Sequence, residues 1–472
     1  MNVSLGHHQY ERFIFLGIGG IGMSALARYL VLRGKSVFGF DRSSSEITLD
    51  LQNKGAEISH DHRPSQQWFA PEFAPSTLIV WTPAIALTDP WMILSKSSGI
   101  RMVKRAELLG ELSAESQNVL AVAGTHGKTT TSAILAHLLV DSGKQGLGFL
   151  GGIAQNYQSN LILSDSVTSV LSNGGPVDFC VVEADEFDRS FLSIKPHWAC
   201  ITSVDPDHLD IYQDKETFVA AFELFAQSLE PEHLFIAEGL DLKGVKVGFS
   251  DHAQIKAEQV SVISGAYRFN LKFDHEVWDN LTGPLPGRHN LTNVMMAVTM
   301  ARAFGLTQNE VSRALANFKG VQRRFNQYTL PGNRVLIDDY AHHPTELKAL
   351  LQGVKEFYVD QPHVLLFQPH LFTRTRDFAA DFAQVLNDFD RVILMPIYPA
   401  RELPIPGVDS AWLASQCAGS TVQSFDTPEA LQAFAHDFSD AALKSKAPSV
   451  FIVAGAGDIG LQVQSLIQKL SS

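Results

Sequence analysis

The sequence predicts an α/β protein of three tandem domains, spanning residues 1–113, 114–320 and 321–472. Its 472 residues exceed what one hydrophobic core normally organises, and ~150 residues per domain gives about three domains. Two glycine-rich turns, at residues 17–22 and 124–127, each stand between a short apolar run and a helical pattern. This alternation is typical of α/β sheets. A third alternation of apolar runs and helical stretches fills the C-terminal part.

The composition is that of a soluble globular protein. Hydrophobic residues make up 45% and charged residues 18%, and 37 Lys and Arg stand against 50 Asp and Glu, a formal net charge of -13. This balance argues against a nucleic-acid partner or an anionic-membrane partner. The three cysteines lack CxxC spacing, which favours a reducing compartment. No signal-peptide pattern or membrane-length apolar run is present, so we expect a cytoplasmic protein.

The first domain opens with an apolar strand, residues 12–16, followed by a glycine turn and a helix. The helix is indicated by apolar residues at helical spacing, and it stops at Gly34. Further strands are expected over 36–40, which ends before Asp41, and over 77–81. The sequence therefore predicts strand, turn, helix, strand at the start of the chain.

The turn carries a GxGxxG pattern in Gly17, Gly19 and Gly22, and Asp41 follows nineteen residues after Gly22. This matches a Rossmann dinucleotide fingerprint. The physical basis is less specific, because small residues let any diphosphate approach backbone N–H groups at the positive end of a helix. A nicotinamide dinucleotide, another diphosphate ligand and a purely structural turn all remain open from this pattern.

The second domain opens with an apolar run over 118–124, followed by a glycine turn and a helical pattern over 129–140. Apolar runs near 179–185 and 198–205 predict further buried strands, and 239–286 alternates as edge strands do, with antiparallel pairing expected. These elements predict a second nucleotide-type sheet.

The loop AGTHGKTTT, residues 123–131, is the sharpest motif in the chain. Walker A spacing would put a glycine at Val122, but this loop has Gly124, so it is a shorter GxxGKT[ST] variant. Backbone donors would wrap phosphates, Lys128 would reach the β/γ oxygens, and a threonine hydroxyl would bind Mg²⁺.

Two acidic clusters follow strands of this domain: Glu183, Asp185 and Glu186 after the first, and Asp207, His208 and Asp210 after the second. Each alone is most simply a solvated strand end or a helix cap. Beside a phosphate loop they suit a Mg-ATP site, because carboxylates and an imidazole can hold the metal that neutralises phosphoryl charge.

In the third domain the sequence predicts strands near 335–340, 363–370, 391–398 and 449–457, and a helix over 344–357. Four polar clusters stand beside buried runs, and their principal members are Arg288, His289, Asn290, Asn293; Arg323, Arg324; Asp339, Tyr340, His342, His343; and His370, Arg374, Arg376. The presence of His342 and His343 can also be explained structurally, as residues at the capped start of a helix. Together the clusters favour a substrate cleft.

The motifs GTHGKTTT, EADEFDRSF, DPDHLD, GRHN, QRRF, DDYAHHPTE and QPHLFTRTRD occur in this order, and with them the chain resembles the Mur ligase family along essentially its whole length. The resemblance implies an N-terminal Rossmann-like UDP-sugar domain, a central P-loop ATPase domain and a C-terminal Rossmann-like domain that closes over the substrates.

The GIGGIGMSALA opening and the QPHLFTRTRD motif are most similar to the branch of the family that adds L-alanine. The resemblance implies ATP-dependent ligation of L-alanine to the lactyl carboxylate of UDP-N-acetylmuramate through an acyl phosphate, with Mg²⁺ and with ADP and phosphate as products. The murein-tripeptide recycling branch is the alternative, and an NAD-dependent oxidoreductase and a non-catalytic nucleotide-binding module are remoter ones. The partners would be small molecules, and the protein a monomer or homodimer.

The resemblance also implies residue roles. Those expected at the ATP site are Gly124, Thr125, His126, Gly127, Lys128, Thr129, Thr130, His289, Asn293, Arg324 and Asp339. Thr129 and Glu183 are expected on one Mg²⁺, and His208 together with Glu183 on a second. The UDP diphosphate would lie on Gly17, Gly19, Gly20 and Gly22, and the amino acid near Tyr340, His342 and Arg374. The catalytic set would be Lys128, Glu183, His208 and Arg374.

Four positions depart from patterns found in the family. Leu371 stands where many members have arginine, which leaves Arg374 or Arg376 to compensate. Ser203 and Asp205 replace an asparagine and a glutamate, and Phe222 stands where some relatives carry a carbamylated lysine. An apolar residue such as Phe222 at this position is expected for the alanine-adding branch.

Overall fold

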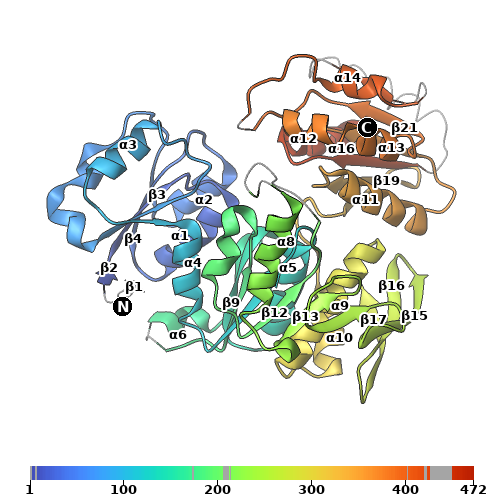
Figure 1. Ribbon diagram of the computed structural model, residues 1–472, viewed down its shortest axis with the longest axis horizontal. Helices are drawn as coiled ribbons and strands as arrows, with labels where there is room; N and C mark the ends of the chain where they lie inside the picture. The colour runs from blue at the N-terminus through green and yellow to red at the C-terminus, as the bar shows by residue number, and fades with distance from the viewer. Residues whose placement is uncertain are drawn as a thin grey trace. The chain divides into compact units, whose positions relative to one another are not determined.

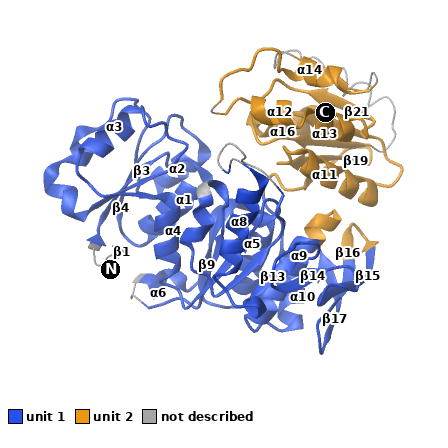
Figure 2. Cartoon of the chain, viewed as in Figure 1, with its two compact units in different colours: residues 1–261, 268–284, 292–321 blue, residues 262–267, 285–291, 322–472 orange. Residues whose placement is uncertain are grey.

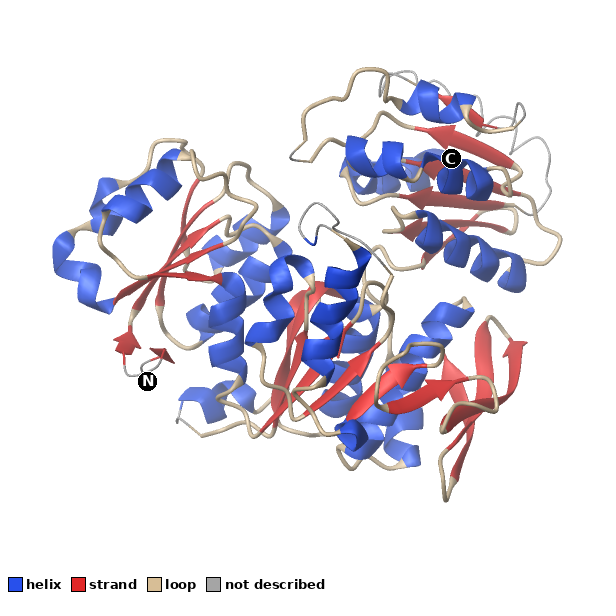
Figure 3. Ribbon diagram, in the orientation of Figure 1, coloured by secondary structure: helices blue, strands red, loops and turns tan. Residues whose placement is uncertain are grey.

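The computed structural model describes residues 3–5, 8–172, 175–205, 212, 214–400, 402–418, 422–425 and 449–471. It is a mixed α/β structure, with sheets of five, ten and six strands and a two-stranded ribbon among the described residues (Figure 3). The chain divides into two compact units (Figure 2). One holds Met1–Ser261, Arg268–Pro284 and Thr292–Val321, and the other Val262–Tyr267, Leu285–Leu291 and Gln322–Ser472.

The N-terminal sheet is parallel, with strand order β5-β4-β3-β6-β7. Its strands are β3 (Arg12–Leu16), β4 (Ser36–Phe40), β5 (Glu57–Ser59), β6 (Thr77–Trp81) and β7 (Met102–Lys104), after the ribbon β1 (Val3–Leu5) and β2 (His8–Tyr10). Its α-helices are α1 (Ile21–Leu32), α2 (Glu46–Asn53), α3 (Pro90–Ser97) and α4 (Arg105–Ser113), with 3₁₀ helices η1 (Gln66–Phe69) and η2 (Pro71–Ser76). The strands predicted at 12–16, 36–40 and 77–81 are confirmed.

Helix α1 forms as its apolar spacing predicts. Leu26, Ala27 and Leu30 are buried, and the helix ends where Gly34 adopts a φ of +70°. Buried Asn160 on the central sheet donates a hydrogen bond to Ser24 Oγ at 2.9 Å, which ties α1 to that sheet (Figure 1). The glycine turn at the start of α1 is therefore held beside the central domain.

The central sheet has the order β10-β9-β11-β8-β12-β13-β14-β15-β16-β17. Its strands are β8 (Asn118–Ala123), β9 (Gly146–Ala154), β10 (Ser159–Leu163), β11 (Phe179–Glu183), β12 (Trp198–Ile201), β13 (Leu234–Ala237), β14 (Val245–Gly248), β15 (Ile255–Ile263), β16 (Ala266–Lys272) and β17 (Val277–Gly283). Its helices are α5 (Lys128–Asp141), α6 (Val167–Ser172), η3 (Phe187–Ser193), α8 (Lys215–Ala226), η4 (Pro231–His233), α9 (Arg288–Ala303) and α10 (Gln308–Asn317).

The middle of this sheet positions the phosphate loop. Strand β8 lies between the parallel strands β11 and β12, so the carboxyl ends of all three meet at one edge. The edge strands β15 and β16 are joined by two residues, a link that only antiparallel neighbours allow. The antiparallel edge expected over 239–286 is thus present, although β14 pairs parallel with β15.

The C-terminal sheet has the order β18-β19-β23-β20-β21-β22; β18 pairs antiparallel with β19, and the other neighbouring strands pair parallel. Its strands are β18 (Asn326–Leu330), β19 (Arg334–Asp339), β20 (His363–Phe367), β21 (Arg391–Leu394), β22 (Val422–Ser424) and β23 (Val450–Ala454). Its helices are α11 (Pro344–Phe357), α12 (Phe372–Asp377), α13 (Ala379–Leu386), α14 (Ser410–Ser415), η5 (Asp458–Gln462) and α16 (Val463–Ser471). Separate apolar clusters cover the two faces, as in a doubly wound sheet.

The helix predicted over 344–357 is confirmed as α11. Pro344 occupies its first turn, and His343 and Glu346 form a capping box. In the part of the chain that the structure describes, no helix is both long and apolar enough to cross a membrane.

Candidate active site

The phosphate loop connects β8 to α5 and depends on two glycines with positive φ. Gly124 has a φ of +133° and Gly127 a φ of +83°. A Cβ on Gly124 would lie 2.2 Å from Thr202 Oγ1, and one on Gly127 would lie 2.3 Å from Asn293 Oδ1. Neither position accepts a side chain, so the loop's shape requires these glycines. Asn293 of α9 thereby lies against the loop, as its expected place in the ATP site requires.

Lys128 is the first residue of α5, and its ammonium group turns back into the loop. Nζ donates to the carbonyl oxygens of Gly124 at 2.6 Å and Thr125 at 3.2 Å, and it lies 2.6 Å from Oε2 of Glu186. Burial by itself lowers the pKa of Lys128, but the carboxylates of Glu186, Asp185 and Glu183 outweigh it and raise that pKa. The lysine is therefore charged and positioned at the mouth of the loop.

Glu183 ends β11 beside this loop and meets the second residue of α5. Its Oε1 accepts from the Thr129 hydroxyl at 3.0 Å, and its Oε2 accepts from the Gly151 N–H at 2.7 Å. A Cβ on Gly151 would lie 2.5 Å from Glu183 Oε1, so glycine is needed for this approach. Two of the three residues expected on the metal are thus brought together.

The oxygen ligands of Thr129 and Glu183 suit a hard divalent cation such as Mg²⁺. The third expected ligand, His208, lies outside the described residues, as do Asp207 and Asp210. Within the described ranges, no group of three or more His, Cys, Asp and Glu residues is arranged to hold a metal.

The strand end after β12 supports the loop through the two positions that depart from the family pattern. Ser203 Oγ accepts from the His126 N–H at 2.8 Å. The Thr125 hydroxyl donates to the Asp205 carbonyl at 2.9 Å and accepts from the Asp205 N–H at 3.0 Å. Ser203 and Asp205 therefore hold Thr125 and His126 in place, and Thr130 is buried in the first turn of α5.

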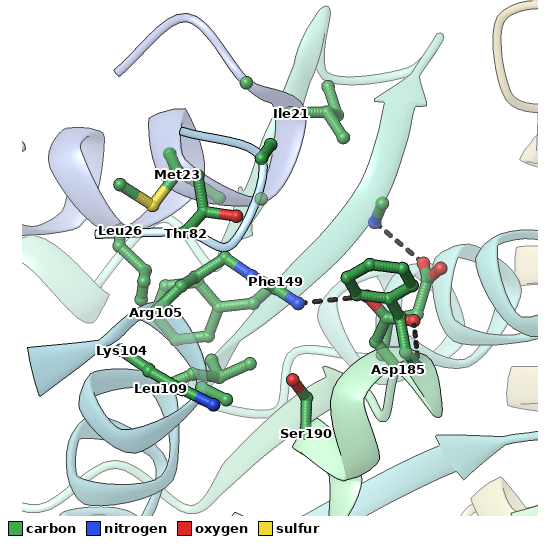
Figure 4. A pocket seen from close by; sticks show the side chains of 18 of the residues that line it. Ile21, Met23, Leu26, Thr82, Lys104, Arg105, Leu109, Phe149, Asp185 and Ser190 are labelled. Carbon is green, nitrogen blue, oxygen red and sulfur yellow. Dashed lines mark hydrogen bonds and ion pairs between the residues drawn. The ribbon is translucent and has the colours of Figure 1, made fainter. Parts of the chain in front are cut away.

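A cavity of about 330 Å³ runs between the glycine turn of the N-terminal domain and the acidic end of β11. Its lining includes Gly20 and Gly22 together with Glu183 and Asp185; Asp185 is labelled in Figure 4. Glu183 therefore faces both this cavity and the phosphate loop. Glu183 therefore connects the predicted nucleotide site at the phosphate loop with the predicted diphosphate site at the glycine turn.

Arg105 is the cation that crosses the cavity. Its Nη2 lies 3.0 Å from Asp185 Oδ2, and both side chains are labelled in Figure 4. A Cβ on Gly22 would lie 2.7 Å from Arg105 Nη1, so this glycine leaves room for the guanidinium group. Lys104 adds a second cation to the lining.

The remaining glycines shape the turn itself. Gly17 has a φ of +86°, and the Gly20 N–H donates to the Gly17 carbonyl at 3.1 Å. The Gly19 N–H donates to Asp41 Oδ2 at 2.8 Å. The acidic residue after β4 thus contacts the turn directly in this structure.

In the C-terminal domain, Asp339 ends β19 and organises the turn after it. Its carboxylate accepts from the Phe325 N–H at 2.7 Å and the Ala341 N–H at 2.8 Å. Burial raises the pKa of Asp339 to about 6, although the Arg324 guanidinium opposes the shift. Arg324 also lies 4.9 Å from the centre of the Tyr340 ring.

Four residues of the C-terminal domain form one chain of contacts. The rings of Tyr340 and His342 meet edge to face with centroids 5.3 Å apart, and those of His342 and His370 do so at 5.6 Å. Arg374 Nη1 lies 3.4 Å from His370 Nδ1 and is buried, with 7% of the residue exposed. The three residues expected around the amino acid are therefore grouped, with His370 between two of them.

Arg376 differs from Arg374 in its surroundings. It is half exposed and pairs with the neighbouring Asp377 at 2.7 Å. Of the two arginines that follow Leu371, Arg374 is the one directed into the cluster. His289 packs beside Gly287, where a Cβ would lie 2.6 Å from the imidazole.

The site contains Lys104 and Arg105, which the sequence did not single out, and also Asp185, Glu186, Ser203 and His370, which belong to motifs that it did. The acidic run after β11 indicated Asp185 and Glu186, and the QPH motif indicated His370. Arg105 has no such signal, because it opens an ordinary amphipathic helix.

Three family models cover most of the chain. They are the catalytic domain of the Mur ligase family over residues 12–117, the Mur ligase middle domain over 122–301, and the Mur ligase glutamate ligase domain over 323–457.

Curated relatives match over nearly the full length. The UDP-N-acetylmuramate--L-alanine ligase of Christiangramia forsetii is 44% identical, with 98% of each chain covered. The one of Flavobacterium psychrophilum is 43% identical, covering 100% of this chain and 99% of the relative.

Solved structures share the fold. The UDP-N-acetylmuramate-alanine ligase of Thermotoga maritima superposes with a TM-score of 0.78 at 26% identity, covering 97% of this chain and 98% of that one. A murein peptide ligase of Psychrobacter arcticus has a TM-score of 0.66 at 20% identity, covering 98% and 99%. At that identity the second likeness concerns the fold alone.

Proposed function

Because this chain belongs to the Mur ligase family, we propose that it joins L-alanine to the lactyl carboxylate of UDP-N-acetylmuramate in peptidoglycan precursor synthesis. It is an ATP-dependent, amide-forming ligase that uses a divalent cation. Full-length relatives bearing the alanine ligase name support the choice of amino acid. The oxygen ligands at Thr129 and Glu183 support Mg²⁺ as the cation.

The observation that carries this proposal is the double placement of Glu183. It contacts Thr129 at the phosphate loop and also lines the cavity that reaches Gly20 and Gly22. A nucleoside diphosphate on the glycine turn and ATP on the phosphate loop would therefore converge on one carboxylate. A ligase that phosphorylates its sugar-nucleotide substrate needs that convergence.

The reaction balances in two displacements. A carboxylate oxygen of the lactyl group attacks the γ-phosphorus, the bond to the β-phosphate oxygen breaks, and ADP leaves. The alanine amine then attacks the acyl carbon, loses a proton, and displaces inorganic phosphate, which leaves the amide. Mg²⁺ would offset phosphate charge when bound at Thr129 and Glu183, and a second Mg²⁺ would be held by Glu183 and His208.

The protein's own contribution is positioning and electrostatics. Lys128 lies at the loop mouth, where its ammonium can bind β/γ oxygens and reduce the repulsion between two anions. The backbone of residues 124–127 would cradle the phosphates. Further proposed nucleotide contacts are His126, Thr130, His289, Asn293, Arg324 and Asp339.

The UDP diphosphate is proposed to lie at Gly17, Gly19, Gly20 and Gly22, at the N-terminus of α1. This position favours anions because backbone N–H groups point outward there. Arg105 and Lys104 extend the cationic side of the cavity toward Glu183. We therefore add both to the proposed sugar-nucleotide site.

The amino acid is proposed to bind at Tyr340, His342 and Arg374. A buried guanidinium is suited to clamp a carboxylate by paired hydrogen bonds. His370 contacts both His342 and Arg374, which supports its inclusion as a residue that orients the arginine.

The proposed domain boundaries remain near residues 113 and 321. The first family model ends at residue 117 and the second begins at 122, which supports the first boundary. The third model begins at 323 and the second compact unit continues from Gln322, which supports the second boundary. We further propose a cytoplasmic monomer or homodimer, since ATP and the sugar nucleotide are intracellular metabolites.

The test is ADP release that depends on both UDP-N-acetylmuramate and L-alanine, with meso-diaminopimelate and murein tripeptide supplied as competing amines. Alanine should support the fastest turnover. Faster reaction with the tripeptide would instead assign the recycling activity, and NADH formation without ADP release would assign an oxidoreductase.

A further inference from the structure

Glu186 is a buried carboxylate at the phosphate loop. It follows β11, its residue is 2% exposed, and its Oε2 lies 2.6 Å from Lys128 Nζ. Its backbone carbonyl accepts from the Tyr212 hydroxyl and from the Arg189 N–H at 2.9 Å. The backbone that carries this carboxylate is therefore fixed by two hydrogen bonds that do not involve the lysine.

The contacts of Lys128 use all three hydrogens of its ammonium group. Two go to the carbonyls of Gly124 and Thr125, and the third goes to Glu186. An ammonium group has three donors and no acceptor. A phosphate oxygen can therefore bind Lys128 only by displacing one of these acceptors.

Glu186 is the acceptor that a phosphate would displace. The two carbonyls are neutral and belong to the loop itself. The carboxylate is anionic, as a phosphate oxygen is, so the phosphate can replace it as the acceptor. The neighbouring carboxylates are engaged elsewhere, since Glu183 contacts Thr129 and Asp185 contacts Arg105. Keeping Glu186 charged beside an incoming triphosphate would also add repulsion at short range.

We propose that, when no nucleotide is bound, the Glu186 carboxylate pairs with Lys128 in place of a nucleotide phosphate. It releases the lysine when nucleotide binds and pairs with it again when products leave. The inference rests on the proposed binding of ATP phosphates by Lys128. It makes Glu186 a positioning residue that weakens nucleotide binding and aids product release. Burial raises the pKa of Glu186 to about 7, which accords with a carboxylate that tolerates separation from its cation by taking up a proton.

The experiment compares ADP and adenosine binding to the full-length protein and to Glu186→Gln, which keeps the shape of the side chain and removes its charge. ADP should bind roughly 5- to 15-fold more tightly to the variant, because the glutamine amide oxygen can still accept from Lys128 but without the charge that strengthens the contact. Adenosine has no phosphate, so its affinity should not change. Glu216→Gln makes the same charge change at an exposed position of α8 and should alter neither.

Two results would overturn the proposal. Unchanged or weaker ADP binding in Glu186→Gln, with adenosine binding preserved, would mean that the carboxylate supports the bound state. Parallel changes for ADP and adenosine would indicate a general effect on the site. If the glutamine variant does not fold, Glu186→Asp, which withdraws the carboxylate by one methylene, should tighten ADP binding, and its failure to do so would have the same meaning.

These outcomes are distinct from failure of the proposed function. A wild-type protein that binds no ADP would contradict the ATP site itself. Wild-type ADP binding that Glu186→Gln leaves unimproved would contradict the inference alone.

Discussion

Arg105 and Asp185 form an ion pair at 3.0 Å that connects the start of α4 to the loop after β11, although 80 residues separate them in sequence. The pair crosses the cavity that contains Glu183, so an anionic substrate entering from the glycine turn would meet Arg105 beside its carboxylate partner. The guanidinium is partly buried, which strengthens its attraction for phosphate relative to an exposed cation.

Arg105→Met should therefore raise KM for UDP-N-acetylmuramate by roughly 10- to 100-fold, because it removes a charge-assisted contact worth about 1.5 to 3 kcal/mol. KM for ATP should stay within about twofold. Steady-state kinetics with each substrate varied in turn provides the measurement, and Arg63→Met at an exposed position serves as the control. Equal changes in both KM values would remove Arg105 from the sugar-nucleotide site.

Lys128→Ala should abolish ligation and leave UDP-N-acetylmuramate binding nearly intact. The lysine contacts the phosphate loop and Glu186, and it does not line the cavity in the described structure. Calorimetric binding of the sugar nucleotide would show the separation, with Lys215→Ala as an exposed control. Loss of sugar-nucleotide binding together with activity would contradict the two-site arrangement.

Glu183→Ala should increase the Mg²⁺ concentration needed for half-maximal activity by at least about tenfold and strongly lower kcat. The substitution removes an oxygen ligand for the cation and also the acceptor of the Thr129 hydroxyl and Gly151 N–H. Magnesium titration of the initial rate is the measurement. A wild-type Mg²⁺ dependence would locate the cation elsewhere.

Arg374→Ala should raise the alanine KM by roughly 10- to 100-fold while hydroxylamine still traps the acyl phosphate formed from ATP and UDP-N-acetylmuramate. Activation of the sugar carboxylate does not require the amino acid. Arg376→Ala is the matched control, because Arg376 is half exposed and pairs with Asp377. Unchanged alanine KM in Arg374→Ala would overturn the amino-acid pocket.

Asp338 gives the C-terminal domain a pH-dependent stability. Burial, assisted by Asp339 and opposed by Arg323, raises its pKa from 3.8 to about 7; Tyr328 is the other titratable group coupled to it. The folded state therefore holds a proton that the unfolded chain has lost, and the free energy of unfolding falls as pH rises from 4 toward 7.

Asp338→Asn removes this titration. Relative to wild type, the variant should gain at least about 1 kcal/mol in the free energy of unfolding between pH 5 and pH 8. Denaturant unfolding of the C-terminal transition at both pH values measures the gain, and Asp388→Asn, an exposed change, should show none. A constant difference between Asp338→Asn and wild type across this range would contradict the buried proton.

The sequence predicted most elements near the proposed ligands because their patterns are local. An apolar run before Gly17 and another before Gly124 mark β3 and β8, and Pro344 with Glu346 marks the start of α11. Periodicity and capping chemistry operate within a few residues, so they can be seen without tertiary contacts.

Strand β9 could not be predicted in the same way. Its sequence, GLGFLGGIA, is rich in glycine, which usually weakens a strand. The structure explains the composition: a Cβ on Gly148 would lie 2.8 Å from the Ala136 side chain, and one on Gly151 would collide with Glu183. These requirements come from α5 and β11, so no local pattern contains them.

The candidate site shows the same limit. Lys128, Glu183 and Glu186 stand in recognisable motifs, but the pairing of Lys128 with Glu186 spans 58 residues, and Arg105, which stands in no motif, contacts Asp185 across 80 residues of chain. Charged residues at helix starts and in acidic runs are common on surfaces. Only the fold distinguishes those that line a cavity or pair with a loop lysine.

The cavity between the glycine turn and Glu183 also selects ligands by the distance between their diphosphate and their carboxylate. Its lining includes Gly20 and Gly22 as well as Glu183, so a ligand anchored by its diphosphate at the glycine turn would present a carboxylate at Glu183 only if its sugar arm has the right reach. The same sugar nucleotide without its lactyl ether would fill the anchoring end and stop short of the nucleotide. We expect it to occupy the proposed site without supporting ATP cleavage, because no carboxylate would then lie beside the γ-phosphate.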